Sequence, residues 1–189
     1  MRYILASKSP RRRELLGEII KDFEIITREV DESLPEGIHP REGVEMLAVR
    51  KGSAVVSEVG TDSVVISSDT LVELDGVALG KPTNEEDARN MLRMLSGKAH
   101  NVHTGVAVQA KGKCYSGVAS TAVYFREMTE EEIAEYVASG DPMDKAGSYG
   151  IQSGGGKFVE KIDGDYDTVV GLSLRLVNKL LNNVEKELD

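Results

Sequence analysis

Residues 63–79 read SVVISSDTLVELDGVAL, and this stretch decides the fold class. Its first seven residues are a short apolar run of the kind that becomes a buried strand. The residues after it alternate around Asp75-Gly76, which is the strongest short signal for a β-hairpin. Helical patterns lie on both sides of the stretch. Because helix crossovers and a hairpin occur in one chain, we expect an α/β fold with a mixed sheet and flanking helices.

Other patterns along the chain predict the remaining elements. Helices are expected at 10–20 and 40–59, followed by two helices with capping boxes and by a C-terminal helix. The glycine-rich residues 147–157 have no helix after them, so they are no dinucleotide-binding fingerprint, and we expect a flexible loop there. The two capping boxes are Thr83 with Glu86 and Thr129 with Glu132. The other expected strands are 2–7, 22–27, 101–110, 116–125 and 157–162.

Three arginines, residues 11–13, open the first expected helix, for which Ser9 is a favoured N-cap. Their charge opposes the helix dipole, which favours anions at the first turn, so they cost stability unless an anion arrives. At 100° per residue, Arg12 falls at the centre of the inward apolar stripe. An inward cation beside free backbone N–H groups and serines is suited to hold a phosphate. A solvated arginine run paired with glutamates of the same helix is the alternative.

A second cation and two carboxylates add to this candidate site. Lys51 lies on the apolar stripe of the helix expected at 40–59, where it either reaches out to water or serves a site. Asp69 ends the expected strand, and ligands usually bind at strand ends in α/β sheets. A carboxylate there can bind a divalent cation or accept a proton from water, although starting a turn is its ordinary role. Glu32, in a loop, is another candidate metal carboxylate.

Two further lysines accompany loops. Lys81, in LGKPTN, does not belong to a Walker P-loop, because the earlier glycine and the Ser or Thr after the lysine are missing. Lys145, just before the glycine-rich residues, is either a phosphate ligand or a solvated residue. Cys114 is expected as a buried or strand-edge thiol. The three histidines form no convincing metal set; they are His39, His100 and His103.

Composition and charge exclude several classes of function. The 189 residues, 40% of them hydrophobic, suffice for a single domain over 1–189. A net charge of -9 and a pI near 5.0 argue against binding of a nucleic acid polymer, which needs broad basic stripes. No segment approaches the roughly 18 apolar residues of a membrane span, and one cysteine allows no internal disulfide. We therefore expect a cytoplasmic protein with no membrane partner; a homodimer stays open.

Eight segments resemble, in order and over nearly the whole chain, the motifs of the Maf family of nucleoside triphosphate pyrophosphatases. They read LASKSPRRRELL, VDES, LAVRKGSA, SSDTLV, LGKPTNEEDARNML, LSGKAHNVHTGVAV, YVASGDPMDKAGSYGIQ and GDYDTVVGLSL. Two positions depart from the family pattern: Thr168 stands where asparagine is usual, and Ser173 where proline is usual. Both precede the last expected helix, so they bear on local packing more than on catalysis.

The resemblance implies an inosine triphosphate pyrophosphatase-like fold, with an elongated twisted sheet and two lobes around a nucleotide cleft. It implies hydrolysis of a nucleoside triphosphate between the α and β phosphates, with a divalent metal cation, Mg²⁺ or Mn²⁺. Asp69 resembles the family's proton acceptor, and Glu32 joins it as a metal carboxylate. The residues that resemble phosphate contacts are Ser7, Arg12, Lys51 and Lys81. Those that resemble base-selecting residues are Arg11, Thr70 and Gln152, in the pattern of the branch acting on dTTP and UTP.

Other functions and routes stay open. The chain could be a nucleotide-binding regulator of septum formation with little turnover, or a phosphate-binding module without turnover. Asp69 favours an enzyme, because a pure anion binder gains nothing from a carboxylate unless a metal is present. Ser7 as a covalent nucleophile is disfavoured, since no base accompanies it at a recognisable spacing. Modified pyrimidine nucleotides remain candidate substrates beside dTTP and UTP.

Overall fold

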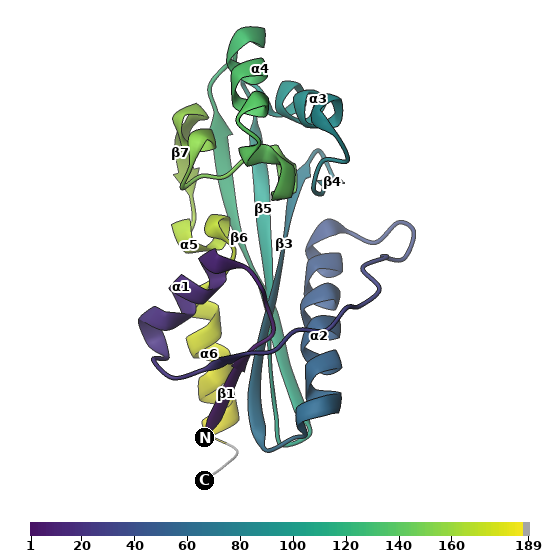
Figure 1. Ribbon diagram of the computed structural model, residues 1–189, viewed down its shortest axis with the longest axis vertical. Helices are drawn as coiled ribbons and strands as arrows, with labels where there is room; N and C mark the ends of the chain where they lie inside the picture. The colour runs from purple at the N-terminus through teal and green to yellow at the C-terminus, as the bar shows by residue number, and fades with distance from the viewer. Residues whose placement is uncertain (187–189) are drawn as a thin grey trace. The chain divides into compact units, whose positions relative to one another are not determined.

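The computed structural model describes residues 1–186, whose seven strands form one mixed sheet (Figure 1). The sheet order is β2-β1-β3-β5-β6-β7, and β4 pairs with β3. β1 is parallel to β2 and β3, whereas β4 is antiparallel to β3 and β7 to β6. The predicted mixed α/β class is confirmed. The strands are β1 Arg2–Leu5, β2 Glu24–Ile25, β3 Ser63–Leu74, β4 Val77–Leu79, β5 Ala99–Ala110, β6 Lys113–Phe125 and β7 Val159–Asp163.

The strand that carries Asp69 continues well beyond this residue, so the expected strand end at Asp69 is wrong. β3 runs on into a hairpin, whose turn residues Asp75 and Gly76 have φ angles of 51° and 81°. Positive φ at both central residues is what a two-residue hairpin of this kind requires, and it confirms the predicted turn. The parallel pairing of β1 with β3 stops at Leu5 and Ile66, three residues before Asp69.

The described residues divide into two compact units. Unit 1 comprises residues 1–69, 104–119 and the segment that begins at Gly171. Unit 2 comprises residues 70–103 and 120–170. Strands β3, β5 and β6 therefore contribute residues to both units.

Unit 1 contains three helices: α1 Pro10–Ile19, α2 Pro40–Val59 and α6 Leu174–Glu185. In Figure 1, α2 lies on one side of the strands of this unit, and α1 and α6 lie together on the other side. Ser9 caps α1 by accepting a hydrogen bond from the backbone N–H of Arg12, as predicted. Ser173 caps α6 by accepting from the N–H of Leu176. The departure from the family pattern at Ser173 thus supplies a helix cap.

Two glycines allow α2 to approach the sheet closely. A Cβ atom on Gly105 of β5 would lie 2.4 Å from the carbonyl oxygen of Val44, and one on Gly52 of α2 would lie 2.6 Å from Ser67 Oγ. Any larger residue at either position would push α2 away from the sheet. The close packing buries the apolar stripe predicted for this helix, formed by Val44, Leu47, Ala48 and Val55. Lys51 is adjacent to Gly52, so this contact also fixes the height of Lys51 over the sheet.

Unit 2 contains α3 Glu85–Leu95, α4 Glu130–Ala138 and α5 Tyr166–Val170, and α3 packs against α4. The capping box of α4 is confirmed. The one predicted for α3 is wrong: Asn84 is the N-cap, and it accepts from the N–H of Asp87. Asp87 in turn accepts a hydrogen bond from the N–H of Thr83 at 2.8 Å. Asparagine is a better N-cap than threonine, which explains the shift by one residue.

The glycine-rich segment of unit 2 contains short 3-10 turns where an irregular loop was expected, and its flexibility stays a prediction. The turns at its two ends are η2 Ala146–Ser148 and η3 Gly154–Phe158, and a further turn, η1 Asp141–Asp144, precedes the segment. Glycine is needed for close packing: a Cβ on Gly154 would lie 2.7 Å from the ring of Tyr136. Because η3 takes up residues 157 and 158, the following strand begins at Val159 rather than at Lys157.

Candidate functional site

Arg12 and Lys51 converge on Asp69 in unit 1. Arg12 Nη2 lies 3.9 Å from Asp69 Oδ1, and Lys51 Nζ lies 3.3 Å from Asp69 Oδ2. The three side chains come from α1, α2 and β3 and are largely buried, with exposed fractions of 14%, 20% and 15%. The two inward cations predicted from helical spacing are therefore confirmed as inward, and they meet at one carboxylate.

Arg12 is fixed by hydrogen bonds in addition to its charge. Its Nε donates to the carbonyl oxygen of Gly171 at 2.7 Å, and its Nη1 donates to Ser7 Oγ at 3.4 Å. Ser68 Oγ donates to the same Gly171 oxygen at 3.1 Å. Burial lowers the pKa of the Arg12 guanidinium, and the charge of Asp69 opposes that shift. An arginine in this setting stays a cation with a fixed orientation.

The anion at the start of α1 belongs to the protein itself. The sequence predicted that the arginines cost stability until an anion arrives, but Asp69 already supplies a negative charge beside Arg12. The alternative of a fully solvated arginine run is wrong for Arg12, whose side chain is 14% exposed. It holds for Arg13, which is exposed, while Arg11 is half-buried.

Lys51 joins Glu32 to the same centre. Lys51 Nζ lies 2.8 Å from Glu32 Oε1, so one ammonium group bridges the two candidate metal carboxylates. A lysine that pairs with two carboxylates at 20% exposure does not extend into water, and that alternative is excluded. Glu32 is more open, with 62% of its side chain exposed.

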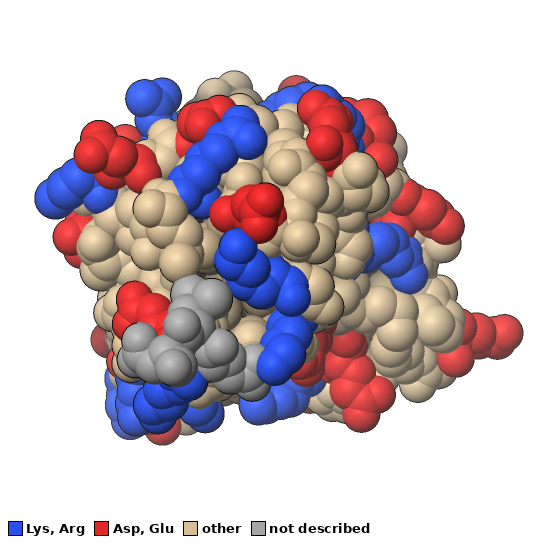
Figure 2. Space-filling view, turned by 90° about the horizontal axis from the view of Figure 1, so that it is seen from below, with Lys and Arg blue, Asp and Glu red and all other residues tan. Residues whose placement is uncertain are grey.

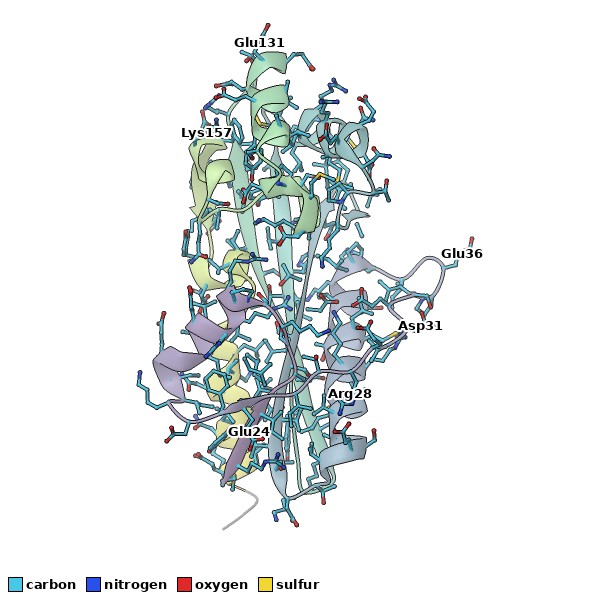
Figure 3. All side chains as sticks on the ribbon, viewed as in Figure 1. Glu24, Arg28, Asp31, Glu36, Glu131 and Lys157 are labelled. Atoms are coloured by element: carbon cyan, nitrogen blue, oxygen red, sulfur yellow. The ribbon has the colours of Figure 1, made fainter. Side chains whose placement is uncertain are left out.

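The loop that carries Glu32 is tied to α2 by Arg50. Arg50 Nη1 donates to the carbonyl oxygens of Asp31 and Ser33, the latter at 2.8 Å, and so holds the residues on both sides of Glu32. Asp31 braces the loop further by accepting from the N–H and the Oγ of Ser33, each at 2.8 Å. Figure 3 shows Asp31 on this loop, beside α2. Sequence analysis missed Arg50, because an arginine before Lys51 looks like an ordinary solvated charge.

Gly171 is the other residue that sequence analysis missed. It contributes only a backbone carbonyl, and 159 positions separate it from Arg12. Its φ angle of 134° lies in a region that glycine adopts without strain. A glycine in VVGLSL was visible in the sequence, but nothing there indicated that its oxygen accepts hydrogen bonds from Arg12 and Ser68.

Ser7 has the surroundings of a binding residue rather than of a nucleophile. It is 7% exposed and lies two residues after the end of β1. Its Oγ accepts from the N–H of Ser9 at 3.2 Å and from Arg12 at 3.4 Å. Neither group can take a proton from a serine hydroxyl, which agrees with the expectation that Ser7 is no covalent nucleophile.

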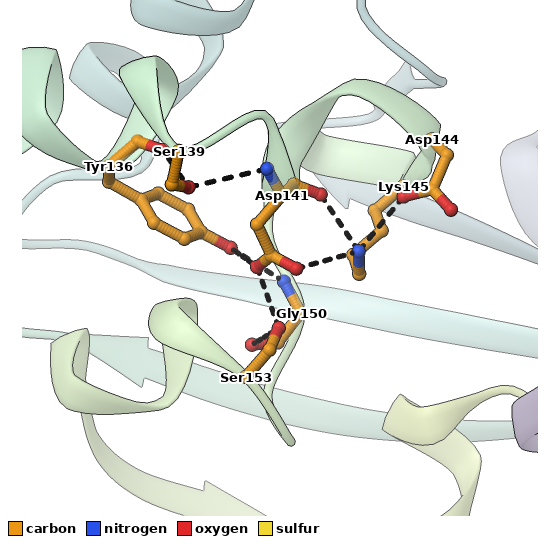
Figure 4. Close-up of polar contacts among 7 residues, drawn as sticks. All are labelled: Tyr136, Ser139, Asp141, Asp144, Lys145, Gly150 and Ser153. Carbon is orange, nitrogen blue, oxygen red and sulfur yellow. Dashed lines mark hydrogen bonds and ion pairs between the residues drawn. The ribbon is translucent and has the colours of Figure 1, made fainter.

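Three predicted site residues belong to unit 2. Thr70 follows Asp69 in β3 and is half-buried, whereas Lys81 and Gln152 are exposed. Their roles stay predictions. Lys145, by contrast, is neither solvated nor available for a phosphate, because its ammonium group donates to Asp141 O, Asp141 Oδ1 and Asp144 Oδ1 at 2.8–3.0 Å (Figure 4). An ammonium group has three donors, and all three are used.

The remaining polar candidates are the histidines and Cys114, to which the sequence assigned no role. His100 contacts Tyr149 at 2.7 Å and His103 contacts Glu73 at 2.5 Å, so the two rings have separate partners. Burial lowers the pKa of His100 to about 4, which keeps it neutral. Cys114 lies near the start of β6 with an exposed side chain, which excludes the buried one of its two expected settings.

Glu32 and Asp69 are the residues that could hold a divalent cation. Among the described residues, no group of three or more His, Cys, Asp or Glu side chains is placed to hold a metal by itself. Two carboxylates nevertheless suit Mg²⁺, which proteins bind through one or two carboxylates together with substrate phosphates and water. The donor set therefore fits a metal that is completed by the substrate, rather than one enclosed by the protein.

The charges on the surface and the lengths of the helices concern two other kinds of partner, a nucleic acid polymer and a membrane. On the face that Figure 2 shows, Lys and Arg side chains are interspersed with Asp and Glu, rather than gathered in one broad basic stripe. Within residues 1–186, none of the helices combines the length and the apolar character that a membrane span requires.

Comparison with known proteins gives a consistent result. Residues 2–184 match the family model described as "Maf-like protein". A protein named dTTP/UTP pyrophosphatase from Bacillus cereus (strain B4264) is 51% identical over 94% of this chain and 93% of its own length. A protein of the same name from Bacillus thuringiensis subsp. konkukian (strain 97-27) is 52% identical over the same shares. The solved structure of the Staphylococcus aureus Ham1 protein shares the fold, with a TM-score of 0.51 at 15% identity over 99% of this chain and 100% of that one.

Proposed function

Since the chain belongs to the Maf family, we propose that it hydrolyses nucleoside triphosphates, dTTP and UTP foremost, to the monophosphate and pyrophosphate. The names of the curated relatives support this substrate class. The observation that carries the proposal is the convergence of Arg12 and Lys51 on Asp69. We further propose that residues 1–189 act as one nucleotide pyrophosphatase domain in the cytoplasm.

The cations of the centre are suited to a polyphosphate. A nucleoside triphosphate carries about four negative charges, and charge-assisted hydrogen bonds from Arg and Lys are among the strongest that a protein makes. Arg12 presents its charge in a fixed orientation, because Gly171 and Ser7 hold the guanidinium. Lys51 supplies a second, compact charge. Ser7 and Lys81 complete the proposed phosphate contacts.

Asp69 is the proposed proton acceptor. In the protein without substrate, both of its oxygens lie near cations. When phosphate oxygens compete for Arg12 and Lys51, the carboxylate gives up part of these interactions and becomes available to a water molecule. The water attacks the phosphorus as its proton passes to Asp69, and the pyrophosphate leaving group departs. A carboxylate that faces a polyphosphate serves an enzyme, as a proton acceptor or metal ligand, better than it serves a protein that only binds anions, so this position of Asp69 supports turnover over binding alone.

Glu32 and Asp69 are the proposed ligands of a divalent cation. A bound Mg²⁺ or Mn²⁺ supplies charge neutralisation on the phosphate oxygens. Lys51 lies between the two carboxylates and holds them in a common place before metal and substrate bind. Arg50 keeps the loop of Glu32 on α2, so Glu32 is presented at a defined position despite its exposure.

Base selection is assigned to the residues that the family resemblance indicates, which are Arg11, Thr70 and Gln152. A carboxamide offers one acceptor and two donors, which can pair with the O4 and N3–H edge that thymine and uracil share. Cytosine and adenine present the reverse pattern and would leave a buried group unpaired, at a cost of about 1–3 kcal/mol. dTTP and UTP are therefore expected to exceed CTP and ATP by at least about tenfold in kcat/KM.

A nucleotide panel scored for pyrophosphate release tests this function. dTTP, UTP, CTP, ATP, GTP and 7-methyl-GTP are compared with Mg²⁺, with Mn²⁺ and with a chelator. We expect pyrophosphate and the monophosphate from dTTP and UTP, with loss of turnover in the chelator. Release of orthophosphate in place of pyrophosphate would contradict the assigned cleavage position. Preference for a purine would contradict the assigned branch.

A further inference from the structure

The residues on both sides of Gln152 are anchored to one group of side chains that centres on the partly buried Asp141 (Figure 4). The N–H of Gly150 donates to Tyr136 Oη at 3.1 Å, and Ser153 Oγ donates to Asp141 Oδ2 at 2.6 Å. The N–H of Ser153 also donates to the carbonyl oxygen of Gly150 at 3.2 Å, which closes the segment into a turn. Gln152 itself is exposed, so it projects from a turn that is held at both ends.

The anchor is a connected network rather than a set of separate contacts. Tyr136 Oη donates to Asp141 Oδ2 at 2.5 Å, and Lys145 Nζ donates to Asp141 Oδ1 at 3.0 Å. Burial acts to raise the pKa of Asp141, but the hydrogen bonds from Ser153, Tyr136 and Lys145 outweigh it and lower that pKa. The carboxylate therefore stays charged, and hydrogen bonds to a charged group are stronger than those to a neutral one.

Close packing holds the turn against this network. A Cβ on Gly150 would lie 2.5 Å from Ser153 Oγ and 2.7 Å from Lys145 Cε. A Cβ on Gly154 would lie 2.7 Å from the ring of Tyr136. The backbone on both sides of Gln152 thus packs directly against the side chains that anchor it. Gly150 and Gly154 have no space for a larger residue.

We propose that Tyr136, Asp141 and Ser153 are positioning residues for Gln152, and that they set the base preference of the enzyme without touching the reacting phosphates. A specificity residue discriminates only if its donors and acceptors are held in place, because a mobile amide can turn to pair with the wrong base. The proposal rests on the proposed function in its final step, which is the reading of the base by Gln152.

The anchor itself is tested without substrate, by hydrogen–deuterium exchange of residues 149–157. Ser153→Ala and Tyr136→Phe are expected to raise the exchange of this segment, and Ser153→Thr, which keeps the hydroxyl, is expected to restore it. Ser116→Ala is the matched control, because Ser116 Oγ donates to Glu45 at 2.6 Å in unit 1. Unchanged exchange in both test variants would overturn the anchoring role, whatever the enzyme's substrate.

The effect on specificity is tested by the ratio of kcat/KM for dTTP to that for CTP. Ser153→Ala is expected to lower this ratio by about tenfold or more, the scale of one lost hydrogen bond to a charged group, mainly through a higher KM for dTTP. Ser153→Thr and Ser116→Ala are expected to retain the wild-type ratio. An equal loss for both nucleotides, or an unchanged ratio with raised exchange, would show that the network is only structural. A wild type that does not cleave dTTP would contradict the proposed function but leave the exchange result standing.

Discussion

Lys51 Nζ lies 3.3 Å from Asp69 Oδ2 and 2.8 Å from Glu32 Oε1, so a single ammonium group joins the proposed base to the second proposed metal carboxylate. Lys51 comes from α2, Asp69 from β3 and Glu32 from the loop before α2. The position of α2 against the sheet therefore decides whether the centre exists. Gly52, whose Cβ would lie 2.6 Å from Ser67 Oγ, allows that position.

Arg12→Lys tests whether orientation matters in addition to charge. The lysine keeps a positive charge but cannot donate to Gly171 O while also facing Asp69. We expect a loss of about 0.5–1.5 kcal/mol in the free energy of unfolding, because the Gly171 carbonyl loses one of its two donors, and a drop of roughly 1–6 °C in Tm. We also expect a lower kcat/KM. Arg13→Lys, one position along on an exposed residue, is the control; equal behaviour of the two variants would refute the fixed-orientation role.

Arg50→Gln tests the support of Glu32. Removing the guanidinium releases the carbonyl oxygens of Asp31 and Ser33, so the Glu32 loop loses its tie to α2. Groups that orient a metal ligand typically contribute about 10–100-fold in metal affinity or activity. We expect the Mg²⁺ concentration at half-maximal activity to rise by about tenfold, with a smaller change in kcat at saturating metal. Arg41→Gln, at the start of the same helix, serves as the control, and an unchanged metal dependence in Arg50→Gln would refute the role.

Because His100 is buried in its neutral form, we expect the free energy of unfolding to fall at acid pH. Burial lowers its pKa from 6.5 to about 4 in the folded protein, so between these values the unfolded chain binds the proton that the folded chain does not. The stability from neutral His100 is complete above about pH 6.5 and is lost as the pH falls toward 4, by about 3 kcal/mol in total. Urea unfolding of wild type and His100→Gln across this range measures the difference. If the free energies of unfolding of the two proteins change in parallel with pH, His100 does not cause the loss of stability.

The sequence predicted those parts of the fold that depend on neighbouring residues. Asp75-Gly76 indicated the hairpin because positive φ is a local property, and Thr129 with Glu132 indicated a helix start because both partners lie within one turn. The N-cap of α3 was predicted at Thr83, but it is Asn84. Both residue types can cap a helix, so the sequence alone does not decide between these neighbours. The inward position of Arg12 followed from helical periodicity, which is local as well.

The contacts that complete the site were not predictable in this way. Gly171 O accepts from Arg12 across 159 positions and carries no side-chain signal. Arg50 looked like a solvated arginine, and Lys145 was expected to be either a phosphate ligand or solvated, yet both donate to backbone carbonyl groups. The glycine-rich segment indicated flexibility by composition, whereas its glycines serve close packing against Tyr136. The roles of these residues depend on contacts between distant positions of the chain and on close packing, which local sequence patterns do not reveal.

The central claim is that Asp69 accepts the proton of the attacking water, and the kcat of Asp69→Asn with dTTP at saturating Mg²⁺ tests it most directly. Asparagine keeps the size of the side chain and an oxygen toward one of the two cations, but it cannot accept a proton. We predict that the variant keeps its circular dichroism spectrum and loses kcat by a factor of about 10² or more, while Asp62→Asn, a surface control in the same unit, retains wild-type turnover. A folded Asp69→Asn protein with near-wild-type kcat would contradict the account.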